Sequence, residues 1–287
     1  MKLKYFQKGF NFSQDGPGNR LVIHLQGCNL KCPWCANPEG LNPNGVLMTT
    51  DKTNGSFCPK GAFADGVLNR ELCRGCSMPC TGIPASGLKL SCTEEEVSDI
   101  VAYCVTCKMM FFDGGGVTIS GGEPTIQFDA LKELLSELKA EGIHTAVECN
   151  GTHPDLPDLF PLIDYLIMDC KHYDSAKHKS VCGMPNDNIL QNIKAACASR
   201  NQLLVRIPLI GGFNASLQDA AQFAALFREI GNENVQYEFL RYHEYGKNKY
   251  EHCGYSYTMT EEAKVPPERI REFSDIFHQN GLKTLHT

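Results

Sequence analysis

Residues 116–150 read GVTISGGEPTIQFDALKELLSELKAEGIHTAVECN. The segment begins with a short apolar run, GVTIS (116–120), which predicts a buried strand. FDALKELLSELKAEG (128–142) has the spacing of an amphipathic helix that ends at Gly142, and HTAVECN (144–150) predicts a second strand. A strand, a helix and a further strand in this order form a βαβ unit, whose two strands are parallel. We therefore expect an α/β protein built on a parallel sheet.

The same alternation extends along most of the chain. Apolar runs predict strands at 21–26, 164–170, 203–210 and 234–240, and amphipathic runs predict helices at 93–112, 188–199, 217–231 and 266–281. We expect Thr93 to cap the first of these helices, and the last begins with proline in its first turn. With about six such units, a full or partial barrel and an open doubly wound sheet both stay open.

The overall composition narrows the class of protein. The chain has 287 residues, of which 42% are hydrophobic and 21% charged, and these proportions exclude disordered and fibrous proteins. It has no run of about 18 apolar residues, and MKLKYFQKGF (1–10) lacks the apolar centre of a signal peptide. We therefore expect a cytoplasmic protein with no membrane partner. The formal net charge of −6 gives no uniform basic field, so we expect no nucleic-acid partner.

Cysteine is unusually frequent, at 15 residues, of which 14 precede residue 200. In a reducing cytosol, thiols at short spacings hold metal more often than they form disulfides. GCNLKCPWC (27–35) places Cys28, Cys32 and Cys35 in a loop after a predicted strand. Three thiolates would leave one iron of a [4Fe–4S] cluster without a protein ligand. The alternative is a zinc site with a fourth ligand from elsewhere, such as His24.

The segment at 37–91 has a different character. It is rich in Gly, Pro, Asn and Thr and has little apolar periodicity, so turns and irregular structure are expected. Such a segment buries little core and needs another source of stability. It contains four cysteines that are able to provide this by binding iron–sulfur or zinc: Cys58, Cys73, Cys76 and Cys80.

Polar and thiol groups follow the predicted strands where each strand ends. In parallel α/β folds, the carboxyl ends of the strands form the functional edge. The residues at these ends are the three cysteines of the first loop, Gly121 to Pro124, Glu148, Asn150, Asp169, Lys171, Arg206 and His243. We expect one active site where they meet, although each charge taken alone is also consistent with an ordinary solvated strand end.

Four segments, in the same order, resemble a known family. They are DGPGNRLVIHLQGCNLKCPWCANPEG (15–40), GGGVTISGGEP (114–124), MDCK (168–171) and RYHEYGKNKY (241–250). The first resembles the radical S-adenosylmethionine (SAM) signature, and together they resemble the activating enzymes of glycyl radical enzymes. The resemblance covers nearly the whole chain. It implies a partial (β/α)6 TIM-like barrel of the radical SAM type with a small ferredoxin-like iron–sulfur insertion.

The resemblance also implies a reaction. In such enzymes SAM chelates the open iron of a [4Fe–4S] cluster, and one electron from the reduced cluster cleaves SAM to give a 5′-deoxyadenosyl radical. The radical takes a hydrogen atom from the α-carbon of one glycine in a partner glycyl radical enzyme. We therefore expect a radical SAM oxidoreductase that acts as an activase, with flavodoxin or ferredoxin as electron donor. The alternatives are a radical SAM enzyme that transforms a small molecule and a non-catalytic iron–sulfur or zinc protein.

The resemblance assigns roles at the cluster and at the methionine end of SAM. The implied catalytic residues are Cys28, Cys32, Cys35, Asp169 and Lys171. The carbonyls of Gly121 and Gly122 would receive the SAM ammonium, with Glu123 adding negative charge. A simple glycine turn between strand and helix is the alternative for these residues. Lys171 and Arg206 would contact the SAM carboxylate.

The remaining roles concern the nucleoside, a cation and the partner. His243 would lie beside the ribose, and Trp34 and Asn37 would contact adenine, although a lone tryptophan is more often a core residue. The resemblance further implies a monovalent cation near Glu148 and Asp169 and contact of Asp15 with the partner's glycine loop. The alternative for that aspartate is a turn cap. The chain departs from many relatives at Ala36, where they have histidine.

The cysteines of the irregular segment resemble part of a bacterial ferredoxin. CPKGA (58–62) is followed by C-x-x-C-x-x-x-C at 73–80, and IPASG (83–87) stands where a second Cys-Pro is expected. We therefore expect one auxiliary [4Fe–4S] cluster on these four cysteines. Zinc on the same four is the alternative, and Cys92 is a candidate to replace one of them.

The expected organisation is a barrel of residues 1–49 and 93–287 with an auxiliary-cluster insertion at 50–92. The cysteines outside both clusters are interpreted as small apolar core residues. They are Cys104, Cys107, Cys149, Cys170, Cys182, Cys197 and Cys253.

Overall fold

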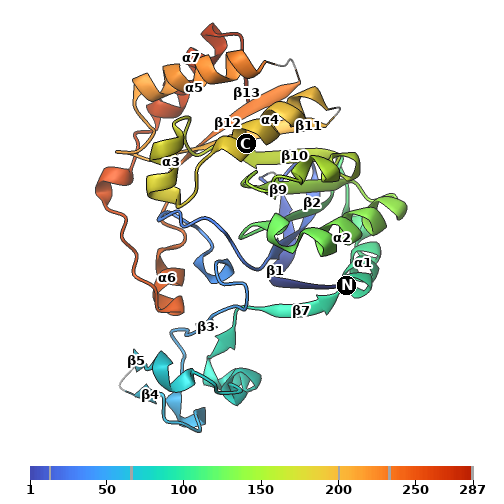
Figure 1. Ribbon diagram of the computed structural model, residues 1–287. Helices are drawn as coiled ribbons and strands as arrows, with labels where there is room; N and C mark the ends of the chain where they lie inside the picture. Colours follow the sequence, from blue (N-terminus) through green and yellow to red (C-terminus); the bar gives the residue numbers. More distant parts are fainter. Residues whose placement is uncertain (13, 65–66, 200, 232–233, 286–287) are drawn as a thin grey trace.

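Six parallel strands form the centre of the structure, a computed structural model that describes residues 1–287 apart from 13, 65–66, 200, 232–233 and 286–287 (Figure 1). They are β2 (Asn19–Leu25), β8 (Gly116–Gly121), β9 (Thr145–Cys149), β10 (Tyr165–Asp169), β11 (Gln202–Leu209) and β12 (Val235–Arg241). The short strand β13 (Lys283–Leu285) extends the sheet in parallel with β12. Because the strands neighbour one another in chain order, the expected βαβ units are confirmed.

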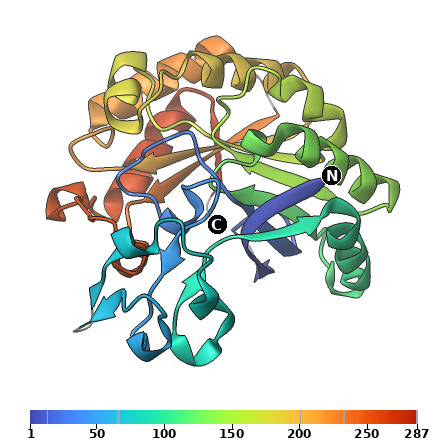
Figure 2. The same ribbon diagram turned by 60° about the horizontal axis from the view of Figure 1, so that its bottom comes forward.

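Amphipathic helices connect the strands. They are α1 (Val97–Thr106), α2 (Phe128–Ala140), α4 (Asp187–Ala198), α5 (Leu217–Ile230) and α7 (Glu268–Gln279). Figure 2 shows these helices along the outer side of the curved sheet, so the expected partial (β/α)6 barrel is confirmed. Two short helices, α3 (Ser175–Cys182) and α6 (Lys247–Cys253), are additional to the prediction. Within the described residues, no helix has the length and apolar character needed to span a bilayer.

The apolar faces of the strands and helices meet in one large core. Ile23, Ile119 and Val147 on neighbouring strands are completely buried. Farther along the sheet, the Tyr237 ring of β12 lies between Phe227 of α5, at 4.6 Å between ring centroids, and Phe277 of α7, at 5.3 Å. Each fully buried side chain of this size stabilises the fold by about 1.5–3 kcal/mol. The core therefore fixes the strands, whose carboxyl ends carry the site.

Two antiparallel strands extend the sheet beyond β2. Strand β1 (Lys2–Phe12) pairs with β2, and β7 (Thr93–Glu96) pairs with β1. The prediction that Thr93 caps a helix is therefore wrong, because residues 93–96 form a strand and α1 begins only at Val97. Opposite charges favour this pairing: Lys2 Nζ lies 3.5 Å from Glu94 Oε2 across the two strands.

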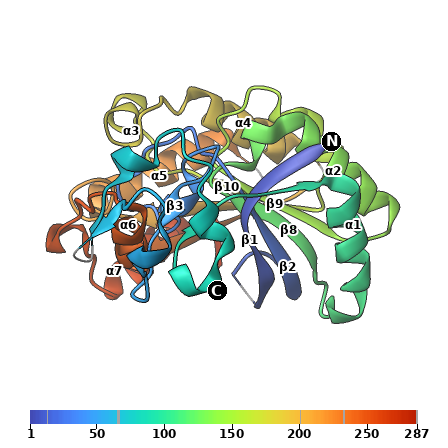
Figure 3. The same cartoon turned by 90° about the horizontal axis from the view of Figure 1, so that it is seen from below.

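The described residues between 47 and 92 are mostly irregular, as the turn-rich composition of 37–91 predicts, and lie beside the barrel (Figure 1). Among these described residues, regular structure is limited to two short antiparallel pairs, β3 (Leu47–Met48) with β6 (Lys89–Leu90) and β4 (Phe63–Ala64) with β5 (Val67–Leu68), and to short 3-10 turns. Leu47, Cys80 and Leu88 make a small apolar cluster within this segment. Seen from below in Figure 3, the segment lies next to α6, which contacts β3.

Candidate active site

A cavity of about 240 Å³ lies at the carboxyl ends of the strands. Many of the predicted site residues line it: Cys28, Cys32, Trp34, Cys35, Asn37, Gly121, Gly122, Glu148, Asp169, Lys171 and His243. Further lining residues are Leu30, Ala36, Leu41, Ser120, Cys149, Asn150, Pro208 and Leu240. The structure therefore brings together groups that are more than 200 residues apart in the chain. Of the predicted site residues of the barrel, Asp15, Glu123 and Arg206 lie outside this lining.

The loop with the first three cysteines is held by backbone hydrogen bonds. Gly27 N donates to Gly40 O at 2.7 Å, and Cys28 N donates to Leu41 O at 3.1 Å. A further bond joins Lys31 N to the carbonyl of Cys182 in α3 at 2.8 Å. These contacts close the loop on itself and anchor it to the barrel, so that the three thiols face one cavity.

The environment of these thiols fits an iron–sulfur cluster. Cys32 is buried and Cys28 and Cys35 are half-buried, and burial raises the pKa of Cys28 to about 12 and that of Cys35 to about 11. Such thiols deprotonate when a metal binds them. The backbone N–H of Asn37 donates to Cys35 Sγ at 3.4 Å, a contact that stabilises a thiolate ligand. In the described part of the chain, no group of three His, Cys, Asp or Glu is placed to hold a single metal ion.

His24, considered above as a zinc ligand, has other neighbours. Its ring stacks on Phe6 with 5.4 Å between centroids, and its Nδ1 is buried without a hydrogen-bond partner among the described residues. It is not one of the residues that line the cavity. Burial lowers its pKa, so the ring is held neutral.

The two glycines after β8 are required by close packing of the chain itself. Gly121 has a φ of +139°, and a Cβ at this position would lie 2.3 Å from the backbone of Leu25. A Cβ on Gly122 would lie 2.2 Å from the carbonyl oxygen of Gly27. The pair therefore permits β8 to approach the cysteine loop, in addition to exposing backbone to the cavity.

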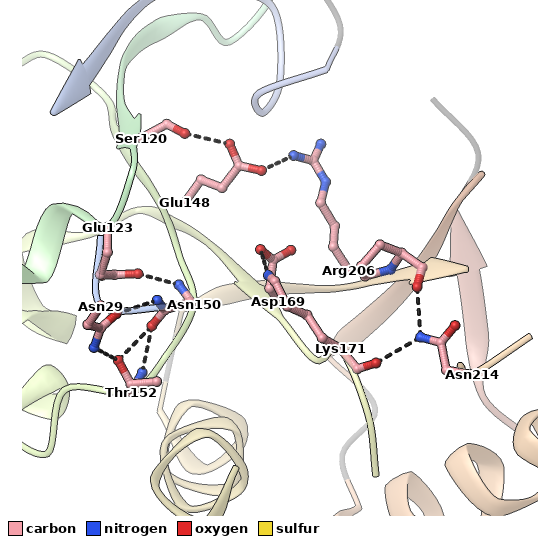
Figure 4. Close-up of polar contacts among 11 residues, drawn as sticks. Asn29, Ser120, Glu123, Glu148, Asn150, Thr152, Asp169, Lys171, Arg206 and Asn214 are labelled. Carbon is pink, nitrogen blue, oxygen red and sulfur yellow. Dashed lines mark hydrogen bonds and ion pairs between the residues drawn. The ribbon is translucent and has the colours of Figure 1, made fainter. Parts of the chain in front are cut away.

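Glu148 connects the cavity with a buried arginine. Its carboxylate accepts hydrogen bonds from Ser120 Oγ at 2.8 Å and from Arg206 Nη1 at 2.5 Å (Figure 4). Arg206 Nε also donates to Glu238 Oε2 at 2.7 Å. Burial opposes ionisation of Glu148, but the Arg206 charge prevails and lowers the pKa of this carboxyl group. Because Arg206 is committed to two carboxylates and does not line the cavity, it is a supporting residue in this geometry.

Asp15 lies behind the same carboxylate. It accepts a short hydrogen bond from Asn11 Nδ2, and its own backbone carbonyl accepts one from Thr118 Oγ1 at 2.7 Å. Burial, followed by the negative charge of Glu148, raises the pKa of Asp15 to about 6. The half-buried aspartate therefore belongs to a network of acidic groups around Arg206.

Asp169 and Lys171 form an ion pair at the end of β10. Lys171 is buried, with 8% of its surface exposed, and its backbone carbonyl accepts a hydrogen bond from Asn214 Nδ2 at 2.7 Å. Although burial opposes its charge, Asp169 raises the pKa of Lys171, so the amine stays protonated. The pair gives the cavity a fixed cation next to a fixed anion.

Glu123 has a different role from the one expected. It is completely buried and accepts hydrogen bonds from the backbone N–H of Thr125 at 2.9 Å and of Asn150 at 2.6 Å. Figure 4 shows it turned toward the backbone of Asn150. Burial raises its pKa, and these donors oppose that rise. Glu123 thus connects the turn after β8 with the end of β9 through hydrogen bonds. Its carboxylate faces backbone N–H groups, and the residue does not line the cavity.

The aromatic residues of the cavity are packed from behind. The Trp34 ring lies 5.3 Å from that of Phe213 between centroids, and the His243 ring stacks on Tyr245 at 4.2 Å. Tyr245 itself is 81% exposed. Trp34 therefore packs against Phe213 and also lines the cavity, so it has both of the roles considered in the sequence analysis, core residue and ligand-facing residue.

The thiols of the four insertion cysteines influence one another electrostatically. Burial and then the neighbouring thiols of Cys58, Cys80 and Cys76 raise the pKa of Cys73. Backbone N–H groups donate to Cys58 Sγ at 3.3 Å and to Cys76 Sγ at 3.4 Å, as at a thiolate site. Cys92 has other neighbours: its Cβ would be 2.5 Å from a Cβ on Gly45. The described residues thus favour the first four as ligands of one group.

Several residues of the site were not predicted. Cys149 lines the cavity and Cys182 packs against Cys32, although both were interpreted only as core residues. Lys249 in α6 bonds to Asn37. These residues carry no signal of their own in the sequence, because their roles depend on which strand end or helix meets the cysteine loop.

Comparison with known proteins identifies the family pattern. The sequence matches the Radical SAM superfamily over residues 69–224 and a 4Fe-4S single cluster domain over residues 14–59. It is 37% identical to the isethionate sulfite-lyase activating enzyme of Nitratidesulfovibrio vulgaris (strain Hildenborough), an alignment that covers 93% of this chain and 92% of the relative. It is 31% identical to the 4-hydroxyphenylacetate decarboxylase activating enzyme of Clostridioides difficile, with coverage of 93% and 90%.

Solved structures agree on the fold. A domain of pyruvate-formate lyase-activating enzyme from Bacteroides vulgatus has a TM-score of 0.51 and 27% identity, and covers 60% of this chain and 98% of its own. A radical SAM methyltransferase from Sphaerobacter thermophilus has a TM-score of 0.57 over 97% of this chain and 72% of its own. At 15% identity, the latter supports the fold alone.

Proposed function

The chain belongs to the radical SAM superfamily and, within it, to the activating enzymes of glycyl radical enzymes, and we propose that it forms a glycyl radical in one partner enzyme. The observation that carries this proposal is the cavity itself. Three thiols from one loop, two glycines, the Asp169 and Lys171 pair and His243 all line it. Thiols and charged groups in one cavity suit a ligand that chelates iron through one part and carries a nucleoside as another part.

The proposed ligands of the SAM cluster are Cys28, Cys32 and Cys35. When bound, a [4Fe–4S] cluster supplies the electron that cleaves SAM. The protein holds the three thiols on a loop fixed by the bonds of Gly27 and Cys28 to residues 40 and 41. A loop held in this way keeps the three thiols in place for one cluster.

We propose that the methionine end of SAM lies against the end of β10. Lys171 is the cation of the cavity wall and faces the carboxylate, while the carbonyls of Gly121 and Gly122 receive the ammonium. In this proposal Arg206 does not contact SAM directly, because its guanidinium is paired with Glu148 and Glu238. It influences the site through Glu148.

The nucleoside and the partner occupy the remaining wall in this proposal. Trp34 and Asn37 contact adenine, and His243 lies by the ribose. Glu148 and Asp169 are candidates for a monovalent cation, since both offer carboxylate oxygens to the cavity. Asp15 is half-buried beside Glu148, and we propose that it faces the partner's glycine loop.

We further propose that residues 50–92 form an insertion with one auxiliary [4Fe–4S] cluster on Cys58, Cys73, Cys76 and Cys80. The mutual electrostatic influence of the four thiols and the two N–H donors to sulfur support it. A flavodoxin or ferredoxin is the proposed electron donor. We place the protein in the cytoplasm, where reducing conditions suit its 15 cysteines.

The partner is a glycyl radical enzyme in this proposal. The relatives are named for activation of a sulfite-lyase, a decarboxylase and a dehydratase. Because these partners differ in the chemistry of their substrates, we propose that surfaces outside the cluster and SAM motifs select the partner.

The proposal is tested with anaerobically purified protein. Reduced protein and SAM are incubated with a candidate partner glycyl radical enzyme, and the doublet electron paramagnetic resonance signal of a glycyl radical is expected. Cleavage of SAM without that signal favours a small-molecule substrate. Zinc without sulfide in the purified protein excludes the radical reaction altogether.

Iron analysis tests the auxiliary site separately. About eight irons per chain are expected for two [4Fe–4S] clusters and about four for one. Replacing Cys73 and Cys76 by alanine removes the auxiliary cluster. If the variant still cleaves SAM at the normal rate with a protein donor, the auxiliary cluster does not relay electrons.

A further inference from the structure

Lys249 of α6 joins two residues that follow the cysteine triple. Its Nζ lies 2.7 Å from Oε1 of Glu39 and 2.8 Å from Oδ1 of Asn37. Asn37 lines the cavity, whereas Lys249 and Glu39 lie behind the wall. The ammonium group therefore influences the cavity through the Asn37 amide.

Glu39 anchors the ammonium firmly. The residue is 7% exposed, and its Oε2 is buried without a hydrogen-bond partner among the described residues. Its backbone carbonyl accepts bonds from Gln26 Nε2 at 2.8 Å and Ser91 Oγ at 2.9 Å. Because a buried carboxylate without a cation is costly, this fixed anion holds Lys249 in place.

The ammonium in turn fixes the orientation of the amide. An ammonium group has three donors and no acceptor, so only the oxygen of Asn37 is able to face it. A flipped Asn37 amide would place its NH2 group against the N–H groups of the Lys249 ammonium. Asn37 also stands at the N-cap position of the 3-10 turn Pro38–Gly40, yet makes no side-chain capping bond there. Its side chain is thus diverted from the usual local role of asparagine.

The remaining amide group is a donor without a partner. Asn37 Nδ2 makes no hydrogen bond to any described residue, and Asn37 lines the same cavity as Trp34. A ligand at this wall therefore meets a flat aromatic ring and a hydrogen-bond donor whose direction is set by charge.

We infer that Lys249 is a positioning residue that fixes the Asn37 amide as a donor, so that this wall selects a nucleobase with a hydrogen-bond acceptor facing it. The inference rests on the proposed function, since the base is the adenine of SAM. Adenine offers ring nitrogens as acceptors. Without Lys249 the Asn37 amide is able to rotate. This wall of the cavity then no longer favours a base that presents an acceptor over one that presents a donor.

The test uses S-adenosylhomocysteine and three analogues, in each of which CH replaces one ring nitrogen that accepts hydrogen bonds. Binding is measured by equilibrium dialysis with anaerobic, cluster-loaded protein. The wild type is expected to bind one analogue roughly tenfold more weakly than the parent ligand. In Lys249→Met this penalty should fall to about twofold or less, because the donor is no longer fixed.

Two further variants separate positioning from loss of structure. Lys249→Arg keeps a cation and should restore the penalty. Lys247→Met is the matched control, because Lys247 begins the same helix and is exposed; it should bind all four ligands as the wild type does. If Lys249→Met fails to load iron, Lys249→Gln replaces it, since glutamine fills the space but does not impose one amide orientation.

If Lys249→Met, or Lys249→Gln, binds the disfavoured analogue as weakly relative to S-adenosylhomocysteine as the wild type does, the inference is overturned and the proposed function is not affected. A wild-type protein that binds no S-adenosylhomocysteine overturns the proposed function, and the inference with it. Equal binding of all four ligands by the wild type also overturns the inference, because the fixed donor then has no acceptor to recognise.

Discussion

Arg206 Nη1 donates a hydrogen bond of 2.5 Å to Oε1 of Glu148, and thereby places a buried cation directly behind the wall of the cavity. Its Nε bonds to Glu238 at 2.7 Å. One guanidinium thus neutralises two carboxylates, of which only Glu148 lines the cavity. The planar, forked geometry of arginine makes this double pairing feasible, and lysine does not reproduce it.

Arg206→Met is therefore expected to destabilise the fold strongly. It leaves the buried Glu238 carboxylate and the half-buried Glu148 carboxylate without their shared cation, a loss that costs roughly 3–5 kcal/mol. The midpoint of thermal unfolding at pH 8 should fall by roughly 10 °C. Arg228→Met is the control, because Arg228 donates a hydrogen bond to Asn280 at the surface and pairs with no carboxylate among the described residues. A midpoint within about 2 °C of the wild type for Arg206→Met would show that the pair contributes little.

The acid cluster predicts a pH dependence. Asp15 has a pKa of about 6 in the folded protein, raised by burial and by Glu148. A raised carboxyl pKa means that its contribution to stability is present below the unfolded value near 4 and lost as the pH rises through 6.

Asp15→Asn should remove this loss, since asparagine carries no charge. The variant and the wild type should have similar unfolding midpoints at pH 4, and the variant should be more stable by up to about 3 kcal/mol at pH 8. Thermal unfolding across this pH range measures the difference. A difference that does not change with pH contradicts the assignment.

The contact between the insertion and α6 gives a third prediction. Arg70 Nη2 donates to the carbonyl of His252 at 2.9 Å, and Thr49 N donates to the same carbonyl at 3.0 Å. Arg70→Gln should loosen the insertion from the barrel. Amide hydrogen exchange in residues 47–91 and in α6 is expected to accelerate roughly tenfold or more, as charged hydrogen bonds are lost.

Arg74→Gln serves as its control. Arg74 follows Cys73 in the same segment but, within the described residues, forms an ion pair only with Glu71, at the surface, with 79% of its side chain exposed. Exchange in this variant should match the wild type, since exposed ion pairs contribute little. Equal exchange in both variants would indicate that Arg70 does not hold the insertion.

The approach of β8 to the cysteine loop is tested at Gly122. A Cβ there would meet Gly27 O at 2.2 Å and Gly40 O at 2.8 Å. Gly122→Ala must displace the loop, so it should lose the SAM cluster and keep the auxiliary one, with the iron content falling from about eight to about four per chain. Gly9→Ala is the control, because a Cβ at Gly9 meets nothing within 4 Å. Full iron content in Gly122→Ala would contradict this reasoning.

The sequence predicted the barrel because its strands are continuous apolar runs and its helices are amphipathic. Residues 116–150 form β8, α2 and β9 within one or two residues of the predicted limits. The edge strands were harder to predict. TEEE at 93–96 resembles the start of a helix, and only pairing with Lys2 and its neighbours makes it a strand.

The candidate site was predicted mainly from motifs at strand ends. Cys28, Gly121, Lys171 and His243 do line one cavity. Burial, however, directs some of these charges to partners inside the protein. Glu123 accepts hydrogen bonds from backbone amides, and Arg206 pairs with two carboxylates. Whether a strand-end charge faces ligand or protein depends on tertiary partners, which spacing along the chain does not contain.

Helix α6 touches both cysteine-bearing regions within seven residues. Gly246, just before it, lies so near Cys35 that a Cβ would be 2.5 Å from the Cys35 carbonyl, and His252 in its last turn holds Arg70. A chimera that exchanges only the insertion with a relative would break this junction. The transplantable unit is discontinuous, consisting of residues 47–92 together with 246–254, and the two parts should vary in concert among natural homologues.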